Sequence, residues 1–163
     1  MPLGHTSNKM LSQAEEQIQA KVPAKSQSDL ARVVNAGLTI MYSSKLRDKR
    51  NERIAQTTDP AKDAGEGAAR LLVNLYQQSN KTMPVDIAIP ASMIFAFEYL
   101  DLLAQAGKAE ITPDLLAKTT MSTANSALEA LGIKKDILSN MINASQKPQP
   151  AAPQGILAGA QGA

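Results

Sequence analysis

The sequence predicts an all-α fold, a compact bundle of about five to six helices with a buried central helix and extended, mobile termini. Three observations predict it. Apolar residues recur at three- and four-residue spacing in several segments, as on the buried face of a helix. Two segments open with a capping residue followed by proline, Asp59-Pro60 and Thr112-Pro113, the usual start of a helix. The one extended-looking stretch, residues 81–90, has no second strand to pair with, so no sheet is expected.

The 163 residues are enough for one compact domain. We expect residues 1–27 to be a mobile or weakly helical N-terminal arm, residues 28–145 a helical bundle domain, and residues 146–163 a tail rich in Pro, Gly and Ala. Within the arm, a short exposed helix ending before Pro23 and a mobile segment are equally compatible with the polar, weakly patterned sequence.

The first strongly patterned helix begins at the capping pair Ser28-Asp29 and is predicted to run to about Ser43. Residues 45–56 follow as a highly charged segment, which is either a solvated continuation of that helix or a separate short one. Asp59-Pro60 then starts a helix that ends near Ser79-Asn80. Pro84 and Pro90 bracket alternating apolar residues, which favours an extended connector pressed onto the core.

Residues 91–105 are predicted to form the central helix because they are apolar nearly all round, with a polar stripe at Glu98, Asp101 and Gln105. Thr112-Pro113 starts the next helix, which is expected to continue to Gly132. A last amphipathic helix is expected over residues 134–144.

Composition restricts the chemistry. The chain has no cysteine and one histidine, His5, so a disulfide scaffold, a thiol nucleophile, a histidine-based metal centre and a Ser-His-Asp triad are not expected. The formal charge of +2 demands neither a nucleic acid nor a membrane. We predict no catalytic, cofactor or metal site, no secretory signal, and no membrane span, because no segment approaches ~18 consecutive apolar residues.

Two patterns suggest chemistry, but each has a structural interpretation that we favour. Glu98 and Asp101 lie one helical turn apart and could serve a hydrolase as an acid–base pair; the preferred interpretation is a solvated edge of the central helix or pairing with a Lys or Arg. Gly65-Glu66-Gly67 superficially evokes a phosphate loop but lies inside a helical pattern, so Gly67, Ala64 and Ala68 are expected to let another helix pack closely.

The strongest indication of nucleic-acid contact is the run from Lys45 to Arg53, which holds five basic and two acidic residues. Asp48 and Glu52 are interspersed and can pair with the bases along a solvated helix, and no aromatic residues interleave for base stacking. The residues that would contact DNA or RNA are Lys45, Arg47, Lys49, Arg50 and Arg53.

Several segments together resemble the small virion structural proteins of tailed bacteriophages, which are encoded among head, tail and ejection genes. The resemblance covers roughly residues 30–160 and contains no catalytic signature. The segments that carry it are 32–42, 67–73, 83–90, 110–115 and the Pro-rich end that runs into Gly155-Ile-Leu-Ala-Gly159.

The resemblance implies a non-enzymatic virion component, made in the host cytoplasm, present in several copies and touching portal, tail or internal virion proteins, with DNA nearby. Ile156 and Leu157 are the candidate docking residues of the tail. We expect residues 155–158 and the N-terminal arm to become ordered only on assembly. The alternative function is a small helical nucleic-acid-associated or regulatory protein that uses Lys45 to Arg53.

Overall fold

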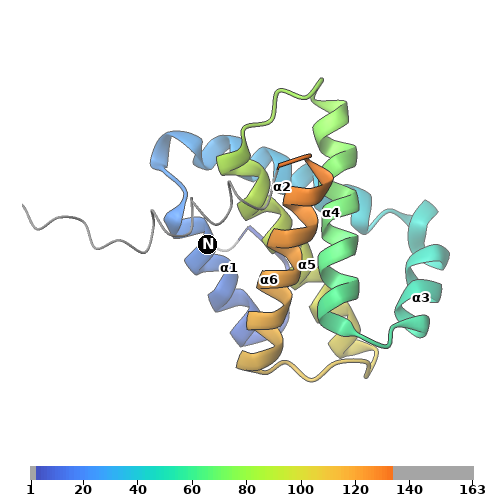
Figure 1. Cartoon of the computed structure of the whole chain (residues 1–163). Helices are drawn as coiled ribbons and strands as arrows, with labels where there is room; N and C mark the ends of the chain where they lie inside the picture. The colour runs from blue at the N-terminus through green and yellow to red at the C-terminus, as the bar shows by residue number, and fades with distance from the viewer. Residues whose placement is uncertain (1–2, 134–163) are drawn as a thin grey trace, which may run out of the picture.

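The computed structural model describes residues 3–133, which form an all-α bundle (Figure 1). No β-strand occurs among these residues, so the predicted fold class is confirmed. The α-helices are α1 (Lys9–Lys21), α2 (Gln27–Met41), α3 (Arg47–Gln56), α4 (Pro60–Gln78), α5 (Val85–Gln105) and α6 (Pro113–Ala130). Two single-turn 3-10 helices, η1 (Ala24–Ser26) and η2 (Ser44–Leu46), precede α2 and α3.

The central helix is α5, as predicted. It contacts α1, α2, α4 and α6, and Phe95, Leu100 and Leu103 on it are fully buried. Gly37 of α2 lies against the Phe95 ring, where a Cβ atom would overlap the ring carbons. Among the described helices, α5 alone is long and apolar enough to cross a membrane, but 72% of that stretch is buried inside the bundle. A core helix has the same composition, so this is weak evidence for a span.

The start of α5 differs from the prediction. Residues 85–90 are not an extended connector, because the helix begins at Val85 and contains Pro90. Ile87 and Ala88 are buried, so this first turn and a half packs onto the core. Pro90 lies beyond the first turn of α5 and has no N–H to donate to the carbonyl of Asp86, so the helix lacks this one bond.

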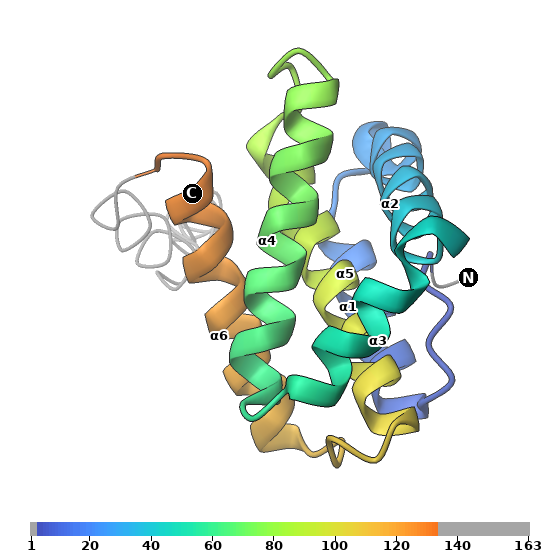
Figure 2. The same ribbon diagram turned by 90° about the vertical axis from the view of Figure 1, so that its right-hand side faces the viewer.

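The contact between α4 and α6 is the most extensive among the described helices, and Figure 2 shows the two helices side by side. A Cβ atom on Gly65 would lie 2.9 Å from the backbone nitrogen of Thr123. The close approach therefore depends on Gly65. Of the three residues predicted to allow such packing, Ala64 and Ala68 are buried, whereas Gly67 lies next to the Arg53 side chain. Thr119 and Thr123 are buried at this contact and donate their hydroxyls to the carbonyls of Leu115 and Thr119, each at 2.7 Å.

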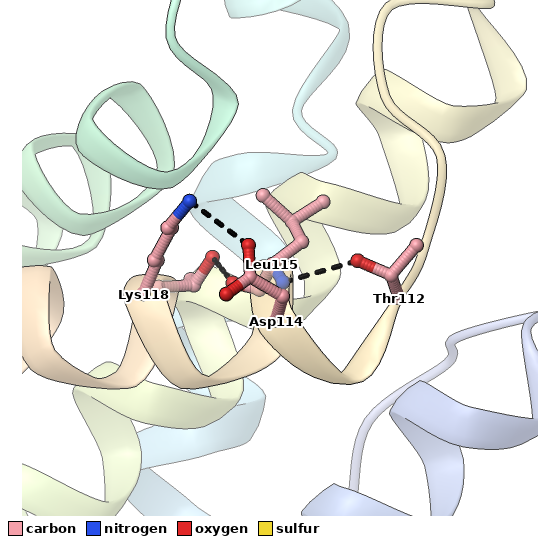
Figure 3. Close-up of polar contacts among 5 residues, drawn as sticks. Thr112, Asp114, Leu115 and Lys118 are labelled. Atoms are coloured by element: carbon pink, nitrogen blue, oxygen red, sulfur yellow. Dashed lines mark hydrogen bonds and ion pairs between the residues drawn. The ribbon is translucent and has the colours of Figure 1, made fainter.

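Both predicted cap–proline starts are confirmed. The Asp59 side chain accepts from the Lys62 N–H at 3.2 Å. At the start of α6, Thr112 Oγ1 accepts from the Leu115 N–H at 3.1 Å, and the exposed pair Asp114–Lys118 adds an ion pair of 2.9 Å (Figure 3). Gly132 has a φ of 73° just after α6, as expected for a glycine that ends a helix.

The bundle begins earlier than residue 28. Of the two alternatives for the N-terminal arm, the helix that ends before Pro23 is present as α1. It is not an exposed helix as predicted, because Leu11 and Glu15 are buried against the body. Leu3 also packs on the core. The expectation that the whole arm orders only on assembly is therefore wrong for residues 3–21. The predicted helix 134–144 and the tail 146–163, with Ile156 and Leu157, lie outside the described residues.

Candidate functional site

The basic segment predicted from the sequence forms η2 and α3. Helix α3 is separate from α2 and lies at one edge of the bundle, on the side that faces the viewer in Figure 2. The segment has two large apolar side chains. Ile54 of α3 is buried, while Leu46 of η2 is 38% exposed.

The five basic residues divide into two sets. Lys45, Arg47 and Lys49 are exposed, whereas Arg50 and Arg53 are partly buried. Arg50 Nη1 donates to the carbonyl of Met41 at 2.6 Å, and its guanidinium lies 5.7 Å from the centre of the Tyr42 ring.

Arg53 is held in a similar way. Its guanidinium lies 5.8 Å from the centre of the Tyr99 ring, and Arg53 Nη2 donates to the carbonyl of Asp63 at 3.4 Å. The two arginines thus connect α3 to the body. The predicted pairing of Asp48 and Glu52 with the bases does not occur, because the ion pairs among residues 3–133 lie on α2, α4 and α6.

A pocket of about 230 Å³ lies between α3 and the body. We call it the α3 pocket. Its walls are mainly apolar, and Lys49, Arg50, Arg53 and Gly67 complete the lining. The remaining wall residues are Ile40, Met41, Leu46, Leu71 and Tyr99.

Two residues of the lining also carry buried polar atoms. Arg50 Nε and the Tyr99 hydroxyl have no hydrogen-bond partner in the described part of the chain, where one other side-chain atom, Glu15 Oε1, shares that state. Burial raises the pKa of Tyr99, while the neighbouring Arg53 guanidinium and Thr57 hydroxyl act in the opposite direction. Because both atoms lie beneath the surface, the pocket presents its cations and apolar side chains to a ligand, and not these two atoms.

Glu98 and Asp101 are not the solvated edge that we expected. Glu98 is 0% and Asp101 3% exposed, and neither pairs with a Lys or Arg within 4.0 Å among residues 3–133. Their partners come from the N-terminus instead. The His5 N–H donates to Glu98 Oε1, and the Ser7 N–H donates to Asp101 Oδ2 at 3.0 Å.

Further donors complete this acidic cluster, which consists of Glu15, Glu98 and Asp101. The Tyr42 hydroxyl donates to Glu98 Oε2 at 2.6 Å, and Gln105 Nε2 donates to Asp101 Oδ2 at 2.8 Å. Burial and this bond to Glu98 raise the pKa of Tyr42. Residues 3–7, which we call the N-terminal strap, therefore cover two carboxyl groups of the central helix.

Glu15 of α1 is the third acid and is 1% exposed. Thr6 Oγ1 donates to its Oε2 at 3.4 Å, while its Oε1 has no partner. Burial, with the nearby Glu98 charge as the next cause, raises its pKa to about 8. Among the described residues, no group of three or more His, Cys, Asp or Glu side chains is placed to hold a metal ion, and this includes the acidic cluster.

Sequence reasoning missed the strap and Glu15. The polar run around Glu15 gave no sign of burial, although Leu11 and Glu15 lie four residues apart and so share a helix face. His5 has an exposed side chain, as expected for a surface histidine, but its backbone N–H takes part in the cluster.

The fold and these sites define an all-α helical bundle with a cation-lined surface pocket and a covered acidic cluster. No protein-family model, curated protein or solved structure matches this chain.

Proposed function

We propose that the chain is a non-enzymatic structural component of a tailed-phage virion that docks onto portal, tail or internal virion proteins. The α3 pocket is the observation that carries the docking part of the proposal, because it joins apolar walls to cations at the surface of the bundle. The virion assignment is supported by the resemblance of residues 30–160. Several copies per particle, synthesis in the host cytoplasm and the docking residues Ile156 and Leu157 belong to the same proposal.

The acidic cluster supports a structural role over the hydrolase interpretation. An acid–base pair must meet its substrate in hydrogen-bond geometry. Glu98 and Asp101 are buried and already accept from Tyr42, Ser7 and the His5 backbone. The N-terminal strap thus joins α5 to α1, where Thr6 donates to Glu15, and Tyr42 joins the end of α2 directly to α5.

The test is mass spectrometry of purified virions from a phage that encodes the chain. We expect the protein in the particle at several copies, and we expect it to remain after salt and nuclease washes. Its absence from particles, with the protein present in the infected cell, would contradict the proposal.

The second candidate function, nucleic-acid contact, is favoured by the exposure of Lys45, Arg47 and Lys49. A phosphate backbone needs several accessible cations, and each neutralised phosphate adds to the salt dependence of binding. Binding to duplex DNA that falls steeply with salt, and that vanishes when Arg47, Lys49, Arg50 and Arg53 are changed to Ala, would establish this function.

A further inference from the structure

We propose that the α3 pocket binds a segment of a partner protein in which a large apolar side chain lies next to an acidic side chain. The proposal deepens the proposed docking function and rests on it. Its three supports are the walls of the pocket, its charge and its size.

The walls and the surrounding surface favour an apolar group. Leu46, which is 38% exposed, is one of four exposed large hydrophobic residues among residues 3–133, and it is part of the lining. Ile40, Met41 and Leu71 line the pocket as well. An apolar side chain placed here would cover this surface and gain from its removal from water.

The charge of the lining favours a carboxylate beside that apolar group. Lys49, Arg50 and Arg53 line the pocket, and no acidic residue does so. An incoming carboxylate would therefore meet three cations and no acidic side chain of the lining. Hydrogen bonds to a charged acceptor are among the strongest in proteins.

The size and the arginine geometry favour a protein side chain over a nucleotide or a nucleic acid. A volume of about 230 Å³ lies below the range of about 300–1,000 Å³ that is usual for small-molecule sites. It suits one large side chain and a neighbouring carboxylate. Backbone carbonyls and aromatic rings already hold Arg50 and Arg53 in place. Held in this way, the two guanidinium groups suit one carboxylate better than a series of phosphates along an extended chain.

The experiment starts with a random peptide library displayed on phage and selected on the full chain. We expect the selected peptides to be enriched in Leu or Phe next to Asp or Glu. The strongest peptide is then synthesised with a fluorophore, together with a version in which each acid is replaced by its amide. We expect the amide version to bind about tenfold more weakly, since it loses hydrogen bonds to a charged group.

Three variants locate the binding. Gly67→Leu places a side chain into the pocket from α4, where a Cβ atom would lie 3.6 Å from Arg53 and meet no backbone; we expect at least a tenfold loss of peptide affinity with an unchanged circular dichroism spectrum. Lys49→Glu should weaken binding about fivefold. Lys45→Glu, in the same basic run but outside the lining, should change it less than twofold, because salt screens an exposed charge at a distance.

Several outcomes would overturn the proposal. The first is a library that yields no peptide with an acidic residue next to an apolar one. The second is peptide binding that survives Gly67→Leu. The third is an equal loss of binding in Lys45→Glu and Lys49→Glu together with steep salt dependence and competition by DNA, which would indicate a nucleic-acid surface. The virion proposal fails separately, by the absence of the chain from particles, whether or not the peptide binds.

Discussion

At the scale of single residues, the carboxyl group of Glu15 links the stability of the protein to pH. Its pKa rises from 4.5 to about 8 on folding, so the folded protein holds this proton more tightly than the unfolded chain does. The contribution to stability is therefore complete below pH 4.5 and is lost as the pH rises toward 8. Glu15→Gln, which cannot ionise, should gain about 2–4 kcal/mol of unfolding free energy near pH 9 and almost nothing near pH 5.

Urea denaturation at the two pH values measures this difference. Glu16→Gln is the matched control, because Glu16 is exposed on the same helix. If both variants shift stability equally at high pH, the effect comes from net charge and not from the buried carboxyl group.

Two glycines of α4 provide a second comparison at this scale. Gly65→Ala should lower the free energy of unfolding by about 1–3 kcal/mol, because the added Cβ atom would lie 2.9 Å from the Thr123 nitrogen and the backbone of α6 must move. Gly67→Ala should raise it by about 0.5–1 kcal/mol, because its Cβ atom meets only the end of the Arg53 side chain, at 3.6 Å. Thermal melts of the two variants measure both effects. A Gly65→Ala variant as stable as the unmodified chain would contradict the close contact between α4 and α6.

At the scale of elements, the sequence predicted the helix starts that depend on interactions between neighbouring residues. Asp59 and Thr112 cap the helices that follow them because each side-chain oxygen reaches an N–H within three residues. Pro90 misled the prediction for α5, since proline disfavours a helical residue before it. The burial of Ile87 and Ala88 outweighs that local preference, and only the packed bundle provides the surface that buries them.

The N-terminal strap could not be predicted, because its partners lie far away along the chain. Ser7 and Asp101 are 94 residues apart, and no periodic pattern marks such a pair. The α3 pocket was not predicted. The sequence drew attention to its basic residues, but as a solvated helix with possible nucleic-acid contact. The inward turn of Arg50 and Arg53 depends on Tyr42 and Tyr99, which come from other segments.

Deleting residues 1–7 tests the contribution of the strap. We expect the free energy of unfolding to fall by on the order of 2 kcal/mol, because Glu98 and Asp101 lose donors while they remain next to Glu15. Helix α1 should persist, since Asn8 still accepts from the N–H groups of Met10 and Leu11. Denaturation followed by circular dichroism measures both quantities. An unchanged free energy of unfolding would mean that water molecules replace the hydrogen bonds of the strap with no loss of stability.

At the scale of the whole molecule, the body and the tail should be separable. Within residues 3–133, the core is formed by side chains of α1 to α6 and their connections. We expect deletion of residues 146–163 to leave the helical content and the melting temperature unchanged. Under the proposed function, the same deletion should abolish incorporation into virions, because a segment that orders on binding supplies contacts only in the assembly.

The double substitution Ile156→Ser and Leu157→Ser makes this test specific, since it removes the apolar pair of the tail and keeps its length. It should also prevent incorporation, whereas the matched change of Ala151 and Ala152 to Ser should not. Quantitative mass spectrometry of particles compares the three chains. If the truncated chain unfolds, the tail belongs to the core; if it folds and is still incorporated, docking takes place through the body, and the α3 pocket becomes the surface to examine first.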